Sequence, residues 1–152
     1  MPDRPPPPDL IVAISSTDDW FQVGTPVQLI AHGETHRDHH ADHEGRRLEL
    51  DFFDASGRPL RPLLGLDLSL TGFAPFGRPA PVAVETRMRR VLRRAQAHLA
   101  EHPSDAATAA WHAVPAPGDL PALVRWAHWA TIDRSNGHMA GWFHNLLHTL
   151  IG

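Results

Sequence analysis

The sequence contains no cysteine, no tyrosine and no lysine, so all 14 of its basic residues are arginine. Without cysteine the chain can form no disulfide, offer no thiolate to a metal and use no cysteine nucleophile. Any metal site must therefore be built from nitrogen and oxygen ligands. The lack of lysine and tyrosine also excludes Schiff-base chemistry and acid–base catalysis by a phenol.

Long apolar runs are missing as well. No stretch approaches the roughly 20 apolar residues of a membrane-spanning helix, and residues 1–9 carry no apolar run of the signal-peptide type. We therefore expect a cytoplasmic protein without membrane association. Its 152 residues fit one domain, and 42% hydrophobic with 20% charged residues is ordinary for a chain that folds around a core.

Composition and hydrophobic periodicity divide the chain into an N-terminal arm, a part with strand patterns and a part with helix patterns. Residues 1–9 are rich in proline and predict a flexible arm, whereas residues 10–152 predict a single domain. Within that domain, β-branched and alternating segments come first and apolar residues at helical spacing follow. The sequence therefore predicts an α+β fold, with a small antiparallel β-sheet over about residues 10–70 packed on three or four C-terminal α-helices over about residues 83–151.

The most regular expected strand is 47–53, where polar and apolar residues alternate and Leu48, Leu50 and Phe52 should point inward. Gly57 closes the turn after it, because glycine adopts a positive φ at little cost. The other expected strands are 10–14, 27–31 and a return from Arg58, with 20–26 as an edge strand or a loop and 72–81 as a linker. The expected helices are 83–101, about 104–113, one capped by Asp119, and 139–150.

The stretch 31–45 holds five of the 12 histidines together with four carboxylates, between two expected strands. Imidazole and carboxylate are the usual ligands of divalent cations where thiolates are absent. A connection of this length is more often functional or disordered than a simple turn. One hypothesis is therefore a site for a divalent metal, zinc, nickel or copper, with the ligands His36, Asp38, His39, His40, Asp42 and His43; the alternative is a solvated or disordered loop.

The sequence leaves open whether such a site would be catalytic. A bound cation could activate water or a substrate as a Lewis acid, with Glu34 or Glu44 as the base. His128, which lies between two tryptophans, is a further candidate for proton transfer, although a partly buried structural histidine fits the same pattern. Neither a Ser-His-Asp arrangement nor a glycine-rich phosphate loop can be assembled from the local sequence.

Two segments in this stretch, His36-Arg37-Asp38-His39 and His40-Ala41-Asp42-His43, resemble part of the metallo-β-lactamase signature H-x-H-x-D-H. The leading histidine of that signature is replaced by Glu34 in one register and by Asp38 in the other. The family also has a larger αββα sandwich, and a helix where this sequence alternates as a strand. The resemblance therefore assigns neither the fold nor the activity of that family to this chain.

A second hypothesis is a non-enzymatic accessory or adaptor protein. Tryptophan and arginine dominate the energetics of protein interfaces, and Trp126 and Trp129 occupy one side of the third expected helix while Arg87, Arg90 and Arg94 lie on the polar side of the first. These residues could bind a protein partner or form a homodimer. The net charge of −3 argues against nucleic acid. Packed tryptophans and solvated or carboxylate-paired arginines are the alternative interpretation.

Overall fold

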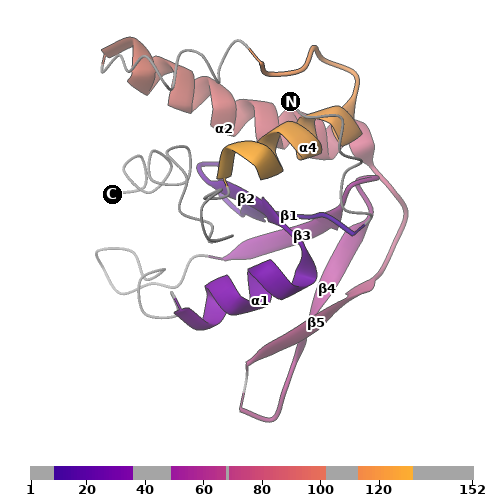
Figure 1. Cartoon of the computed structure of the whole chain (residues 1–152). Coiled ribbons are helices and arrows are strands. Elements are labelled where there is room, and N and C mark those ends of the chain that lie inside the picture. Colours follow the sequence, from indigo (N-terminus) through magenta and orange to yellow (C-terminus); the bar gives the residue numbers. More distant parts are fainter. Residues whose placement is uncertain (1–8, 36–48, 68, 102–112, 132–152) are drawn as a thin grey trace.

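The computed structural model describes residues 9–35, 49–67, 69–101 and 113–131. Within these ranges an antiparallel five-stranded sheet has the order β2-β1-β3-β4-β5 (Figure 1). Its strands are β1 (Ile11–Ser15), β2 (Phe21–Gly24), β3 (Leu50–Asp54), β4 (Pro59–Leu64) and β5 (Leu70–Pro75), and the helices are α1 (Pro26–Thr35), α2 (Pro81–Glu101) and α4 (Leu120–Thr131). The predicted α+β class with an antiparallel sheet is confirmed.

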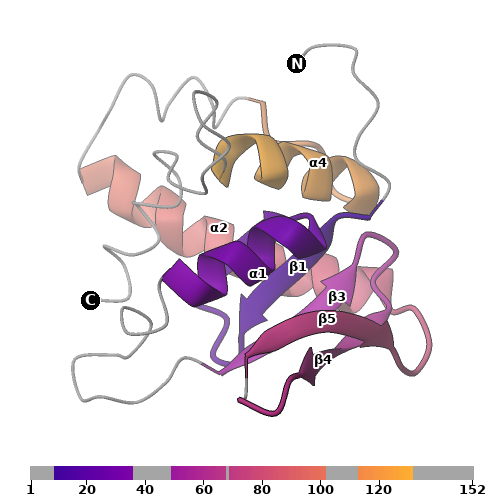
Figure 2. The ribbon, with the colours of Figure 1, turned by 60° about the horizontal axis from the view of Figure 1, so that its bottom comes forward.

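The sheet is covered on both faces. Figures 1 and 2 show α2 and α4 on one side and α1 on the other. Because successive strand residues point to opposite faces, Val12 and Ile14 join the main core beneath α2 and α4, whereas Ile11 packs with Leu29 of α1. This explains why β1 is apolar at four consecutive positions: neither of its faces meets water.

The described helices differ from the prediction in place. Two of the described helices, α2 and α4, follow the sheet, but α1 lies between β2 and β3. The predicted helix at 139–150 and all but the last residue of the one at 104–113 fall outside the described residues, as does the proline-rich arm up to residue 8. No helix in the described part of the chain is long and apolar enough to cross a membrane.

The strand predicted at 27–31 is wrong, because this segment belongs to α1. Thr25 and Gln28 form a capping box: the Gln28 N–H donates to Thr25 Oγ1 at 3.3 Å, and the Thr25 N–H donates to Gln28 Oε1 at 2.9 Å. Pro26 occupies the first helical position, where its missing N–H costs nothing. The Thr-Pro-Val-Gln signal for a helix start therefore outweighs the strand propensity of the β-branched residues that follow.

The linker predicted at 72–81 is also partly wrong, because Leu70–Pro75 forms the edge strand β5. The turn before it is fixed by Asp67, whose Oδ1 accepts hydrogen bonds from the Ser69 N–H at 3.1 Å and the Ser69 hydroxyl at 2.6 Å. Pro75 is tolerated at the end of this strand, since an edge position can lack a ladder donor. The segment 20–26, left open as strand or loop, contains β2.

Two predicted local features are confirmed. Gly57 has a φ of +82° in the turn between β3 and β4. Asp119 caps α4, because its Oδ1 accepts the Ala122 N–H at 3.1 Å. The predicted alternation in β3 holds only from Leu50 to Phe52, which are half-buried around the exposed Asp51; Phe53 is half-buried too, because it packs against the main core while Phe52 packs on the α1 side. Leu48 lies outside the described residues.

The helix α4 is held against α2 by a buried carboxylate. Glu85 of α2 accepts the Gly118 N–H at 2.7 Å, just before α4 begins, and its side chain also receives Arg89 Nε at 3.3 Å. Arg89 donates in turn to the carbonyl of Pro115 at 2.8 Å. These contacts fix the start of α4, so that the helix can pack over β2.

Candidate functional site

The predicted metal ligands lie outside the described residues: His36, Asp38, His39, His40, Asp42 and His43, together with Glu44. The other proposed base, Glu34, belongs to the last turn of α1. In the described part of the chain, no group of three histidine or carboxylate side chains could hold a metal ion. Metal binding by the histidine-rich stretch therefore stays a prediction.

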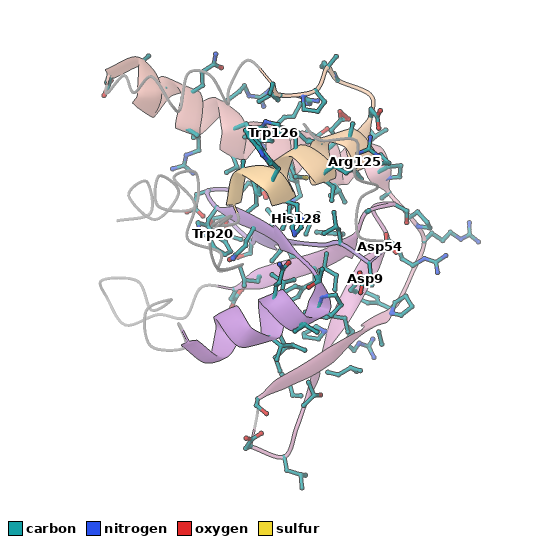
Figure 3. The ribbon with its side chains drawn as sticks, viewed as in Figure 1. Asp9, Trp20, Asp54, Arg125, Trp126 and His128 are labelled. Atoms are coloured by element: carbon teal, nitrogen blue, oxygen red, sulfur yellow. The ribbon has the colours of Figure 1, made fainter. Side chains whose placement is uncertain are left out.

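His128 connects α4 to the capping box of α1 (Figure 3). Its Nε2 lies 3.0 Å from Gln28 Oε1, the same oxygen that accepts the Thr25 N–H. An amide oxygen only accepts hydrogen bonds, so this geometry places the imidazole proton on Nε2. Burial lowers the pKa of His128. The contact with Gln28 supports the cap of α1, whereas it is burial that disfavours the charged form of the ring.

The lowered pKa of His128 predicts a pH-dependent stability. Below about pH 6.5 the unfolded imidazole takes up a proton that the folded one resists. The free energy of unfolding should therefore fall as the pH drops from about 7.5, and this loss should level off below the folded pKa. Urea unfolding at a series of pH values measures it. His128→Gln keeps a donor for Gln28, and its free energy of unfolding should depend less on pH. The same pH dependence in both proteins would contradict a lowered pKa of His128.

The two tryptophans of α4 are mainly core residues. Trp126 has 0% of its surface exposed and belongs to the main core, and the partly buried Trp129 packs against the same cluster. The reason is the position of α4, which contacts both β2 and α2 and so is covered on two sides. In this structure Trp126 offers no exposed surface to a partner, contrary to the adaptor prediction for it.

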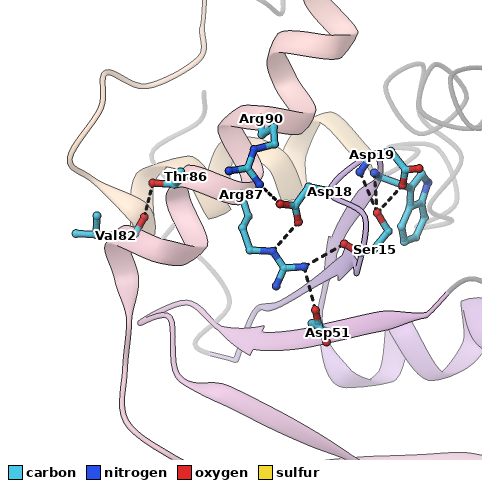
Figure 4. A network of polar contacts seen from close by, with 9 residues as sticks. Ser15, Asp18, Asp19, Asp51, Val82, Thr86, Arg87 and Arg90 are labelled. Carbon is cyan, nitrogen blue, oxygen red and sulfur yellow. Dashed lines mark hydrogen bonds and ion pairs between the residues drawn. The ribbon is translucent and has the colours of Figure 1, made fainter.

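Arg87 and Arg90 are also used within the fold (Figure 4). Both donate to Asp18, in the turn between β1 and β2; Arg87 Nε lies 2.6 Å from Asp18 Oδ1. Arg87 Nη2 donates further to the Ser15 carbonyl at 3.0 Å and to Asp51 at 2.9 Å. Burial alone would lower the pKa of Arg87, but the hydrogen bonds to Asp18 and Asp51 raise it. These hydrogen bonds and ion pairs hold α2 against β3 and the β1–β2 turn.

Arg94, the third arginine predicted to bind a partner, is exposed on α2 and forms no ion pair with the other described residues. It lies two turns beyond Arg87. The structure therefore does not bring the predicted arginines and tryptophans together into one surface.

A groove opens where β4 parts from β3. These strands pair only at Phe52 with Leu60 and at Phe53 with Pro59. Pro62 has no N–H and so cannot continue the ladder as a donor. The groove has a volume of about 450 Å³ and is lined by Leu50, Asp51, Phe52, Phe53, Pro59, Leu60, Arg61, Pro62, Phe76 and Arg87.

The groove combines aromatic surfaces with guanidinium groups. The guanidinium carbon of Arg61 lies 5.3 Å from the centre of the Phe76 ring, and that of Arg87 lies 5.6 Å from the centre of the Phe53 ring. Both distances are within the range of cation–π contacts. Arg87 is already paired, but Arg61 is exposed and forms no ion pair with the described residues. Arg61 can therefore bind a ligand without breaking an existing salt bridge.

Exposed apolar side chains lie along the β4–β5 hairpin, from the groove to the turn. They are Leu63 at 43%, Leu64 at 56%, Leu66 at 108% and Phe76 at 47% of their full exposure; we call these four the hairpin surface. Two of the other exposed large hydrophobic residues, Val27 and Val82, stand on separate helices. Leu63, Leu64 and Leu66 lie toward the turn of the hairpin, whereas Phe76 lies at its other end, where its N–H donates to the Pro59 carbonyl. Large apolar side chains left exposed along one hairpin are a candidate interaction site.

Sequence reasoning missed both the groove and the hairpin surface. One signal was present, because Pro59 and Pro62 in the same strand indicate incomplete pairing with a neighbour. The exposure of the leucines had no local signal, since their spacing also suits a buried strand. Comparisons of the chain with protein-family models, with curated proteins and with solved structures found no match.

Proposed function

We propose that this protein is a non-enzymatic accessory protein that binds a segment of a partner protein through the hairpin surface and the adjoining groove. Three exposed leucines on the hairpin whose strand β4 also lines an open groove with phenylalanine and arginine carry this proposal. It keeps the adaptor class that the sequence offered as its second hypothesis. The proposed binding surface is β4 and its flanks, in place of the α4 tryptophans and α2 arginines.

The physical argument concerns the leucines at the end of the hairpin. Full burial of a leucine side chain stabilises a complex or a fold by roughly 1.5–3 kcal/mol. Leu64 and Leu66 contribute little of this to the fold, because they are largely exposed. A partner that covers them would gain that energy. Phenylalanine and arginine in the neighbouring groove are residue types that anchor interfaces.

Selection from a random 12-residue peptide library on the folded full-length chain tests this function. We expect enriched peptides with Kd values of about 1–100 μM, typical of modest apolar interfaces. The double variant Leu64→Ser/Leu66→Ser should weaken them about tenfold or more. The matched control Val27→Ser/Val82→Ser changes residues of 76% and 77% exposure on other elements and should bind as the wild type does.

Two results would contradict the proposal. One is the absence of any peptide that binds the wild type more tightly than the leucine variant. The other is a stable dimer in light scattering that the leucine variant converts to a monomer, because the hairpin surface would then be an interface between copies of this chain.

The density of histidine and carboxylate in residues 31–45 supports a second candidate function, binding of zinc, nickel or copper(II). If the site were catalytic, Glu34 or Glu44 would act as the base on a metal-bound water. The proposal concerns binding first, and any activity would follow from it.

Metal analysis of untagged protein at pH 7.5 checks the second function. We expect about one equivalent of bound cation, and at least a tenfold loss of affinity in His39→Ala/His43→Ala, because losing two imidazole ligands removes much of the site. His128→Gln is the control, since that histidine already bonds Gln28. Protein without stoichiometric metal, or a double variant that binds equally well, would exclude this site.

A further inference from the structure

The charges around the groove are unbalanced. Arg61 lines the groove. Arg58 and Arg78 lie near the start of β4, because the Phe76 N–H donates to the Pro59 carbonyl at 2.9 Å and so holds the segment after β5 beside the start of β4. Within the described part of the chain, none of these three arginines forms an ion pair. The chain as a whole has a net charge of −3, so this positive surface is a local feature.

Two carboxylates of β3, Asp51 and Asp54, are already engaged. Asp51 binds Arg87 at 2.9 Å. The Oδ1 atom of Asp54 accepts the N–H groups of Ser56 at 2.9 Å and Arg58 at 3.0 Å, which holds the turn between β3 and β4. Neither aspartate forms an ion pair with Arg61. The groove therefore presents a guanidinium that lacks an intramolecular counter-ion among the described side chains.

The backbone of β3 adds hydrogen-bonding groups to the groove. In an antiparallel ladder, the N–H and C=O groups of alternate residues point to the same neighbouring strand. The main-chain N–H and C=O of Asp54 point toward β4, because the N–H donates to the Arg58 carbonyl at 3.0 Å. The main-chain groups of Phe52 and Leu50 therefore point toward β4 as well. Phe52 pairs there with Leu60, but no described strand pairs with Leu50 on that side. The main-chain groups of Leu50 thus face the groove.

From these three observations we infer that the partner segment is an extended, acidic peptide in which a carboxylate is followed closely by an apolar side chain. This inference rests on the proposed function. The carboxylate binds the guanidinium of Arg61, and the apolar side chain packs on Phe53 and Phe76. The peptide backbone bonds the main-chain groups of Leu50, as an added β-strand does.

The placement of Arg61 favours this role over a loose surface charge. Its stem belongs to β4 and its guanidinium lies over Phe76, so that part of its side-chain freedom is already lost before a ligand binds. The planar guanidinium offers paired donors that match the two oxygens of a carboxylate.

Fluorescence anisotropy with peptides enriched on the wild type tests the inference. We expect these peptides to contain Asp or Glu beside an apolar residue, and replacement of that acid by its amide to weaken binding about tenfold. Arg61→Gln should weaken the acidic peptide equally, and the amide peptide should then bind Arg61→Gln no more weakly than it binds the wild type. Arg61→Lys should restore part of the affinity, whereas Arg94→Gln, a change of an exposed arginine on α2, should have no effect.

The outcomes separate this inference from the proposed function. If leucine-dependent peptides are enriched but lack acidic residues, or bind Arg61→Gln as tightly as the wild type, the acidic-segment inference is wrong and the binding function stands. If no peptide depends on the leucines, both fail. A labelled single-stranded 12-nucleotide DNA that binds more tightly than the peptides and competes with them would also overturn it. Unchanged thermal unfolding of Arg61→Gln would show that any loss of binding is not a loss of fold.

Discussion

Replacement of Gly57 by alanine is expected to lower the free energy of unfolding by about 3 kcal/mol or more, because both the backbone conformation and the space around Gly57 exclude a side chain. The φ of Gly57 is +82°, and a side chain in that region costs roughly 1–2 kcal/mol. A Cβ atom would also lie 2.7 Å from the Cα and N atoms of Pro81 and 2.9 Å from the carbonyl carbon of Ala80. These are backbone atoms, so relief requires α2 to move.

Gly118 provides the matched control for this prediction. It also has a positive φ, +101°, but a Cβ atom there would meet nothing within 4 Å. Gly118→Ala should therefore show only the conformational cost of roughly 1–2 kcal/mol. Chemical denaturation of both variants gives the comparison. Equal losses would mean that the close approach of the β3–β4 turn to α2 contributes nothing, and that the contact between these segments is not tight in solution.

Asp18→Asn should destabilise the protein by about 2–3 kcal/mol. Asp18 is 8% exposed and receives both Arg87 and Arg90. Removing one member of a buried ion pair typically costs 3–5 kcal/mol, and we expect less because Arg87 keeps its bonds to Asp51 and to the Ser15 carbonyl. Asparagine preserves the shape of the side chain and tolerates the φ of 55° found at this position.

Asp51→Asn is the control, because it removes the other carboxylate partner of the same arginine. The Asp51 side chain is 51% exposed, and exposed ion pairs contribute about 0–1 kcal/mol. Thermal or urea unfolding of the two variants should therefore rank Asp18→Asn well below Asp51→Asn in stability. The opposite order would show that α2 is held to the sheet through β3 rather than through the β1–β2 turn.

The Asp18 network also bears on the groove. Arg87 lines the groove and lies over Phe53, and its orientation is set by Asp18 at its Nε atom. The same contacts that attach α2 to the sheet therefore shape one wall of the proposed binding site. For this reason, changes at Arg87 would alter stability and binding together, whereas Arg61 allows binding to be tested alone.

Much of the local structure could be predicted from the sequence. The apolar spacing of α2 placed Val84, Met88 and Val91 on one face, and all three are at most 1% exposed. The turn at Gly57 and the cap at Asp119 were also predicted correctly. These features depend on residues within a few positions of one another, so short-range physical chemistry is sufficient to identify them.

The missed features have identifiable causes. In α1, the sequence carries the capping box at Thr25 and Gln28, but the β-branched Val27 and Ile30 also favour a strand, and only the hydrogen bonds of the cap distinguish the two. In β5, proline and glycine suggested a linker, yet the edge of a sheet accepts Pro75 without losing a ladder bond. The covered position of Trp126 required knowledge of where α4 packs.

By itself, the sequence determined the α+β class, the position of the turn at Gly57, the helical spacing of α2, and the absence of thiolate and lysine chemistry. Only the tertiary structure decided which arginines are paired and which is available. Arg87 meets Asp18, 69 positions away, while Arg61 meets Phe76 and no described carboxylate. The physical reason is that charge pairing and side-chain exposure depend on distances across the fold, which local sequence patterns do not encode.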